Sequence, residues 1–225
     1  MSLKKYSFLT LFVYGLSLLT PSLLIYWGFM PNADKMLVIL GLTFTPYMLS
    51  VILCSLLGVF LLTYFYRHQN EPLTFERKKF SALKILLLGS AGIFLSLVIQ
   101  NYASLVEAWL FQSTPESKNT QSITEMILKM PIYVLVTTVT APIMEEFVFR
   151  RAILGFVSRY ANFFIGAVIS SLFFAIAHQD GHLLIYFSLG FFFSLLYYFS
   201  GSIWTSVVTH IGMNLVVILL QFTTY

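Results

Sequence analysis

The sequence predicts an all-α fold, a polytopic transmembrane bundle of about eight helices that forms one integral membrane domain over residues 1–225. Composition supports this fold class, because 58% of the residues are hydrophobic and only 10% are charged, whereas soluble domains carry about 25% charged residues. The mean hydropathy is +0.85. Apolar runs long enough to cross a bilayer also recur along the whole chain.

These apolar runs define the expected helices, and turn and charge signals set their boundaries. The first run is longer than the core of a signal peptide, so we interpret it as a retained span. The expected helices are Ser7–Met30, Met36–Tyr66, Leu83–Trp109, Ile123–Ala141, Ile143–Arg159, Ala161–His178, His182–Phe199 and Ile203–Phe222.

The join between Ala141 and Pro142 decides the number of helices. A continuous helix from Ile123 to Arg159 would be about 55 Å long, much longer than a bilayer core is thick. Proline cannot continue the preceding hydrogen-bond ladder, but it suits the first turn of a new helix. We therefore expect a break at Pro142 and eight helices, whereas a kink at that position would leave seven.

The basic residues predict the orientation, because they gather at the N-terminus and in one loop. They are Lys4, Lys5, Arg67, Arg77, Lys78, Lys79 and Lys84. With eight spans both termini share the side of this loop, and the positive-inside rule makes that side the cytoplasm. We expect a prokaryotic plasma membrane. The loops account for the net charge of +4, so the lipid bilayer is an expected partner and nucleic acid is not.

Charged residues inside an apolar segment mark the candidate site. The segment Pro142–Arg151 carries Glu145, Glu146, Arg150 and Arg151, and each would cost about 2.5–3.5 kcal/mol in lipid unless it pairs or faces the bundle interior. Glu146 and Arg150 are spaced i and i+4, which favours an ion pair. Glu145 projects to another side, so we assign it as a general base and Glu146 as a supporting residue. The alternative is an interfacial salt-bridge cluster.

Two further helices carry polar residues at the same spacing. Phe174 and His178 are one turn apart, as are His210 and Asn214. In an antiparallel hairpin His178 returns to nearly the level of Glu145, and Asn214 comes closer to that level than His210. Alone, His178 could be a hydrogen-bonded residue at the membrane interface, and His210 with Asn214 could be a polar clamp between helices. Together they predict one site, built from three helices, towards the cytoplasmic side.

The order EExxxR, FxxxH and HxxxN, each on its own apolar helix, resembles the CAAX-protease and bacteriocin-processing family of intramembrane endopeptidases, also called the abortive-infection family. The resemblance covers a motif-bearing region of about residues 142–214 and implies hydrolysis of peptide bonds in a membrane-associated peptide or protein. The family pattern commonly continues with glycine or a small residue, where this chain has Arg151. Carried over by position, the resemblance implies a water activated by Glu145 and His178, an oxyanion stabilised by His210 and Asn214, and support from Glu146, Arg150 and Phe174.

The family has been described both as metalloproteases and as metal-independent glutamic proteases. Carboxylates and histidines on neighbouring helices are credible zinc ligands, and Glu145, His178 and His210 would then hold the ion. The sequence has no HExxH pair, and Asn214 is a poor zinc ligand but a good oxyanion donor. We therefore expect a glutamate-activated water and no cofactor.

Other functions are open at this stage. Intramembrane Glu and His residues also build the proton relays of transporters, although no internal repeat of the transporter kind is detectable. A non-catalytic bacteriocin-immunity or scaffold protein could use the same cluster structurally. Members of the family process prenylated CAAX tails or act on bacterial peptides and membrane proteins. We interpret His182 as a solvated or capping residue and Tyr186–Phe199 as a lipid-facing or packing surface.

Overall fold

A computed structural model describes residues 1–39, 42–77, 79–112 and 118–223, and it confirms an all-α polytopic bundle. The α-helices are α1 (Leu3–Tyr26), α2 (Pro46–Arg67), α3 (Ala82–Phe111), α4 (Lys118–Lys129), α5 (Ala141–Glu145), α6 (Leu154–Tyr160), α7 (Phe163–His178), α8 (Leu183–Ser200) and α9 (Ile203–Phe222). Between them lie the 3-10 turns η1 (Thr74–Arg77) and η2 (Pro131–Tyr133), the π-helical stretches η3 (Val136–Thr140) and η4 (Glu146–Ile153), and a hairpin of β1 (Leu37–Ile39) and β2 (Leu42–Phe44). The two strands pair antiparallel, with Leu37 opposite Phe44.

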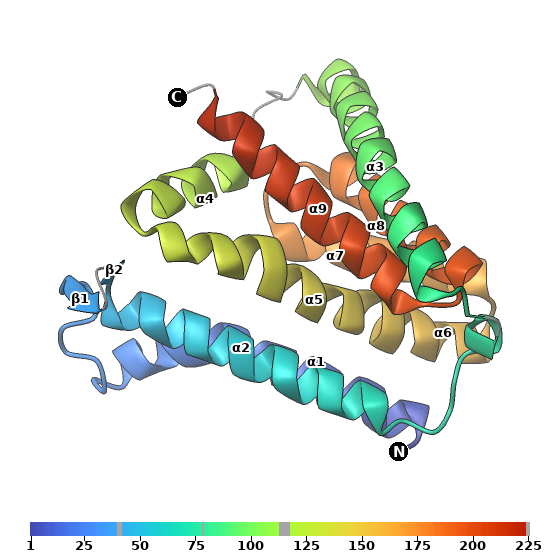
Figure 1. Ribbon diagram of the computed structural model, residues 1–225, viewed down its shortest axis with the longest axis horizontal. Coiled ribbons are helices and arrows are strands. Elements are labelled where there is room, and N and C mark those ends of the chain that lie inside the picture. Colours follow the sequence, from blue (N-terminus) through green and yellow to red (C-terminus); the bar gives the residue numbers. More distant parts are fainter. Residues whose placement is uncertain (40–41, 78, 113–117, 224–225) are drawn as a thin grey trace.

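The bundle surface is apolar, as expected of a surface that faces lipid. Within the described residues, six helices are long and apolar enough to cross a membrane, and α7 is a shorter apolar helix. Large side chains such as Phe8, Phe60 and Phe94 lie exposed on α1, α2 and α3. Figure 1 shows α1 and α2 on one side of the bundle and α3, α8 and α9 on the other. The protein is therefore an integral multi-pass membrane protein.

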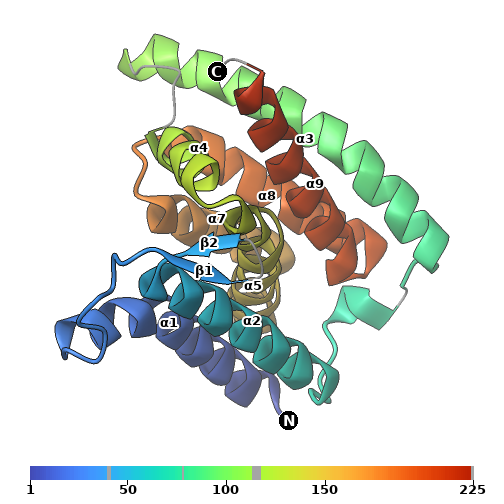
Figure 2. The ribbon, with the colours of Figure 1, turned by 60° about the vertical axis from the view of Figure 1, so that its left-hand side comes forward.

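One continuous segment, Pro131 to Tyr160, runs through the middle of the bundle (Figure 2). The helix break expected at Pro142 is therefore wrong. The chain breaks instead at Met130, whose φ of −142° and ψ of 85° are not helical. Before Pro142, the Ala141 N–H donates to the Val136 carbonyl in the wide winding of η3. We infer that this winding lets the segment continue past a residue that has no N–H to donate.

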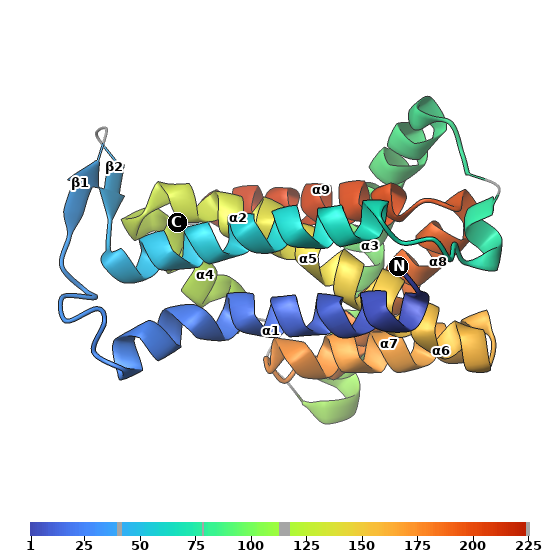
Figure 3. The ribbon, with the colours of Figure 1, turned by 90° about the horizontal axis from the view of Figure 1, so that it is seen from below.

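The moved break changes the topology. Helix α4 is a separate helix of 12 residues, too short to cross a bilayer. The six long helices and α7 then make an odd number of apolar crossings within the described chain. The two termini lie towards opposite ends of the bundle (Figure 3), which does not fit the prediction that both face the cytoplasm.

Hydrogen bonds between loops define two ends of the bundle. At the first, the N-terminal amine donates to the His68 carbonyl at 2.9 Å, and the Phe80 N–H donates to the Ser200 carbonyl at 3.0 Å. At the second, the Asn119 N–H at the start of α4 donates to Asp180 Oδ1 at 3.1 Å, in the turn between α7 and α8. We name these the N-terminal end and the α4 end.

Arg151 builds a buried polar network near the N-terminal end. Its fully buried guanidinium lies 3.5 Å from Glu76 Oε2 and donates to Gln69 Oε1 at 2.5 Å. The Tyr197 hydroxyl donates to Glu76 Oε1 at 2.6 Å, and the ring of Tyr6 lies 5.3 Å from the Arg151 guanidinium carbon. The arginine that replaces a small residue of the family pattern therefore fixes the loop between α2 and α3 against η4.

Candidate active site

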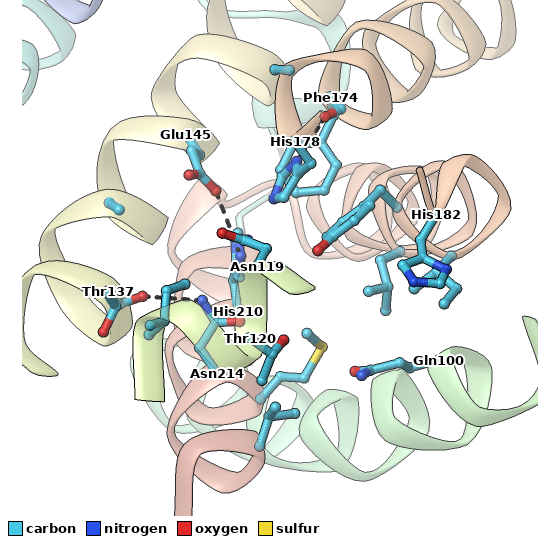
Figure 4. Close-up of a pocket in the computed structure, with 18 of the residues that line it drawn as sticks. Gln100, Asn119, Thr120, Thr137, Glu145, Phe174, His178, His182, His210 and Asn214 are labelled. Atoms are coloured by element: carbon cyan, nitrogen blue, oxygen red, sulfur yellow. Dashed lines mark hydrogen bonds and ion pairs between the residues drawn. The ribbon is translucent and has the colours of Figure 1, made fainter. Parts of the chain in front are cut away.

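A cavity of about 590 Å³ lies inside the bundle, walled by the central segment, α7, α8, α9 and parts of α3 and α4. Its lining includes the four residues predicted to be catalytic: Glu145, His178, His210 and Asn214. Figure 4 shows them around this space, with Glu145 from the central segment, His178 from α7, and His210 and Asn214 from α9. The structure thus brings all four together.

Glu146 and Arg150 form the ion pair expected from their spacing. Arg150 Nε lies 3.3 Å from Glu146 Oε2, and both side chains are fully buried. His210 Nδ1 lies 3.1 Å from the other carboxylate oxygen. Because a carboxylate beside a guanidinium favours the ionised form, it accepts this hydrogen bond and His210 Nδ1 carries a proton.

Glu145 reaches the same histidine from the cavity side. Its Oε2 lies 3.7 Å from His210 Nε2, and its side chain keeps 18% of its surface exposed. His210 is therefore placed between two consecutive glutamates. The π-helical stretch η4 begins at Glu146, and its extra residue per turn reduces the angle between successive side chains.

His178 is fixed by its own helix and by α8. Its Nδ1 lies 2.8 Å from the Phe174 carbonyl, which can only accept, so Nδ1 carries the proton and the neutral ring keeps a lone pair on Nε2. The ring of Tyr186 stacks on His178 with centroids 3.8 Å apart, and the Tyr186 hydroxyl donates to Asp180 Oδ2 at 3.0 Å. Tyr186 was assigned by sequence to a lipid-facing or packing surface, so its contact with the site was missed.

Phe174 links the buried ion pair to His178. Its ring lies 4.7 Å from the Arg150 guanidinium carbon and 4.4 Å from the His178 ring, centroid to centroid. Arg150 also donates to Ser170 Oγ at 3.5 Å. The aromatic ring therefore packs between the cation and the imidazole, where it can hold both in place.

Asn214 Nδ2 donates to the Thr137 carbonyl at 3.2 Å, which leaves its second amide hydrogen for another partner. The expectation that Asn214 would come closer than His210 to the level of Glu145 is wrong. Thr137 precedes Glu145 by two turns of the central segment, and the ionic contact with Glu145 comes from His210. The tilt of α9, which spacing alone does not give, sets this difference.

His182 is not a solvated residue. It is buried in the cavity wall, and its Nδ1 lies 2.8 Å from Glu107 Oε2 on α3. The Leu184 N–H donates to the other oxygen of Glu107 at 2.8 Å. Glu107 was not among the residues predicted from the sequence, although a carboxylate within an apolar helix is itself a sign of a buried partner.

The side chains that could hold zinc, Glu145, His178 and His210, do not form a metal-binding group here. Within the described residues, no three His, Cys, Asp or Glu side chains are arranged to hold an ion. Each histidine has its Nδ1 engaged, with a carbonyl or with Glu146, which leaves the Nε2 atom of each ring and the Glu145 carboxylate as donors. Two imidazole nitrogens and one carboxylate are a donor set that zinc accepts, so these three residues would hold the ion if the protein bound one.

Together, the fold and the site define an integral membrane protein with a buried acid–base site. Residues 127–216 match the family described as type II CAAX prenyl endopeptidase Rce1-like. A Bacillus subtilis (strain 168) protein named "Putative membrane peptidase YdiL" is 34% identical over 197 residues, which cover 87% of this chain and 78% of that protein. "Membrane-embedded CAAX protease MroQ" of Staphylococcus aureus (strain USA300) is 30% identical over 137 residues, 58% of this chain and 56% of that protein.

No solved structure matches the chain. The length and identity of the match to the Bacillus relative, together with the family match over residues 127–216, establish the family. The chain belongs to the Rce1-like CAAX endopeptidases, a family of membrane proteases.

Proposed function

We propose that this protein is an intramembrane endopeptidase that hydrolyses peptide bonds of a membrane-associated peptide or protein with a water activated by Glu145 and His178. One observation carries the proposal: a single cavity gathers Glu145, His178, His210 and Asn214 from three helices. Glu145 is suited to be the base. Among the described ion pairs, Glu145 contacts the imidazole of His210, whereas Glu146 contacts the guanidinium of Arg150.

The reaction needs one proton to move twice. A water between Glu145 and the Nε2 lone pair of His178 gives a proton to Glu145, and its oxygen attacks the carbonyl carbon of the substrate. When the tetrahedral intermediate collapses, the C–N bond breaks and Glu145 returns the proton to the leaving amine nitrogen. Glu145 thus acts first as general base and then as general acid.

The oxyanion is stabilised by the second amide hydrogen of Asn214 and by His210 Nε2. His210 can donate from Nε2 only when both ring nitrogens are protonated, because Nδ1 already donates to Glu146. Losing one oxyanion donor costs about 2.7–4 kcal/mol, so we expect Asn214→Ala to lower kcat about 100- to 1000-fold.

The proposal includes independence from metals, supported by the place of Asn214 in the cavity, because an amide is a poor zinc ligand but a good oxyanion donor. Purified protein should keep its activity after exhaustive chelation, with no metal recovered by elemental analysis. Loss of activity that added Zn²⁺ restores would overturn this part and leave the protease function intact.

The decisive experiment compares cleavage of a peptide library by reconstituted wild type, Glu145→Gln and Glu125→Gln. Glu125 is an exposed glutamate of α4 that does not line the cavity, so it is a matched control. We expect Glu145→Gln to lose cleavage while its unfolding transition in detergent stays that of a folded protein, and Glu125→Gln to cleave normally. If folded Glu145→Gln cleaves at the wild-type rate, the residue is not the base and a structural role of the cluster is favoured.

A further inference from the structure

We propose that the candidate active site is open to the non-cytoplasmic face of the membrane, so that its substrates are peptide segments presented at that face. The identity of the site rests on the proposed function. Its sidedness rests independently on charge and topology.

Basic side chains gather at the N-terminal end. Loop contacts bring Met1 to His68, Phe80 to Ser200 and Arg159 to Glu71, so three loops and the N-terminus share one end. The exposed basic residues there are Lys4, Lys5, Arg67, Arg77, Lys79, Lys84 and Arg159. The acidic residues of the same end, Glu71 and Glu76, are each paired with an arginine.

The α4 end carries no such excess of positive charge in the described chain. Exposed Asp34 stands beside Lys35, and Glu125 stands one turn from Lys129. Asp180 adds a further acidic group in the turn that contacts α4. Because cytoplasmic loops of membrane proteins carry the excess of lysine and arginine, the N-terminal end faces the cytoplasm and the α4 end faces the other side.

The cavity extends from the middle of the bundle to the α4 end. Glu145 is 14 residues from Pro131, about 21 Å along the central segment. The lining continues from Glu145 to Asn119 and Thr120 on α4 and to His182 beside the turn between α7 and α8. Of the described lining residues, none belongs to the loops of the N-terminal end. Water and substrate therefore reach Glu145 from the α4 end.

The wall near the α4 end suits an extended peptide. Gln100 lines it, and the buried Oε1 of Gln100 has no hydrogen-bond partner among the described atoms. Asn119 and Thr120 add polar side chains to the same wall. A buried carbonyl oxygen without a hydrogen-bond donor is costly. The N–H groups of a bound peptide backbone could donate to Gln100 Oε1 and remove that cost. The substrate class is thus a polypeptide segment that enters from outside the cytoplasm.

Cysteine labelling tests the sidedness without any activity assay. Cys54 is the single cysteine of the chain, so Cys54→Ser gives a background into which Glu125→Cys or Lys79→Cys is introduced. Both positions are exposed, one on α4 and one at the N-terminal end. A membrane-impermeant maleimide is applied to intact bacterial cells that express the full chain and to inverted membrane vesicles. The total amount of reactive cysteine in each variant is measured by labelling in detergent.

We expect Glu125→Cys to be labelled in intact cells and Lys79→Cys in inverted vesicles, each at least about tenfold more than in the opposite preparation. The reverse pattern, or equal labelling of both variants in both preparations, overturns the proposed sidedness. Activity gives the separate answer: if labelling follows the expected pattern but Glu145→Gln still cleaves, the proposed function fails and the sidedness of the cavity stands.

Discussion

The buried pair of Arg151 and Glu76, neither of which lines the cavity, allows a quantitative prediction about stability. The perturbations are Glu76→Gln, which keeps an acceptor oxygen for Tyr197, and Arg151→Met, which keeps much of the side-chain volume. The two charges lie 3.5 Å apart in a region with almost no exposed surface. At an effective dielectric constant of about 20 their attraction is about 5 kcal/mol, and removing one partner of a buried pair costs about 3–5 kcal/mol.

We therefore expect either single variant to lose about 3–5 kcal/mol of unfolding free energy, because each leaves one charge buried and unpaired. The double variant should lose clearly less than the sum of the two. The assay is reversible unfolding in mixed detergent micelles, followed by tryptophan fluorescence. Arg159→Gln, which breaks the exposed pair with Glu71, is the control and should leave the transition unchanged. Single losses below about 1 kcal/mol, or strictly additive losses, would refute the reasoning.

Two further predictions concern packing around the site. A Cβ at Gly212 would overlap the side chain of Ile93, so Gly212→Ala should lower the unfolding free energy by about 1–3 kcal/mol. In the control Gly15→Ala the new Cβ meets open space, so the unfolding free energy should change by less than about 1 kcal/mol. Equal effects of the two variants in thermal unfolding would contradict the predicted overlap. Glu107→Gln leaves one acceptor for two donors, His182 and the Leu184 N–H. It should lower the unfolding free energy by about 1–3 kcal/mol and raise KM, and an unchanged KM would argue against a role of this wall in substrate binding.

The sequence was sufficient for the fold class and for the four predicted residues that line the cavity, but not for the contacts of Tyr186 and Glu107. Each pair, Glu146 with Arg150, Phe174 with His178, and His210 with Asn214, lies one turn apart on an apolar helix, and the structure gathers them as the spacing indicates. Spacing could not predict which residue of α9 would reach Glu145. That contact depends on the tilt of the helix, which tertiary packing sets.

The position of one helix break could not be read safely from the sequence, because two prolines offered the same signal. Pro131 and Pro142 both suit the first turn of a helix, and choosing Pro142 adds one span before the helices that follow. The composition of the two segments does differ, since Lys118–Lys129 is largely polar and amphipathic at helical spacing, as a surface helix is. A break at Pro142 predicts a site on the cytoplasmic side, whereas the break at Met130 supports the opposite proposal.

The π-helical winding of η4 has a consequence for how the chain tolerates insertions and deletions. A π turn closes over one residue more than an α turn, so removing one residue between Glu146 and Ile153 would allow ordinary α-helical winding. A deletion between Glu146 and Arg150 would leave the helix apolar, but it would bring both arginines one residue closer to Glu145 in the sequence. Glu146 and Arg150 would lose their i, i+4 spacing, and Arg151 would be displaced from Glu76. Relatives that retain both arginine contacts should therefore keep the spacing of this segment invariant, even where their loops differ in length.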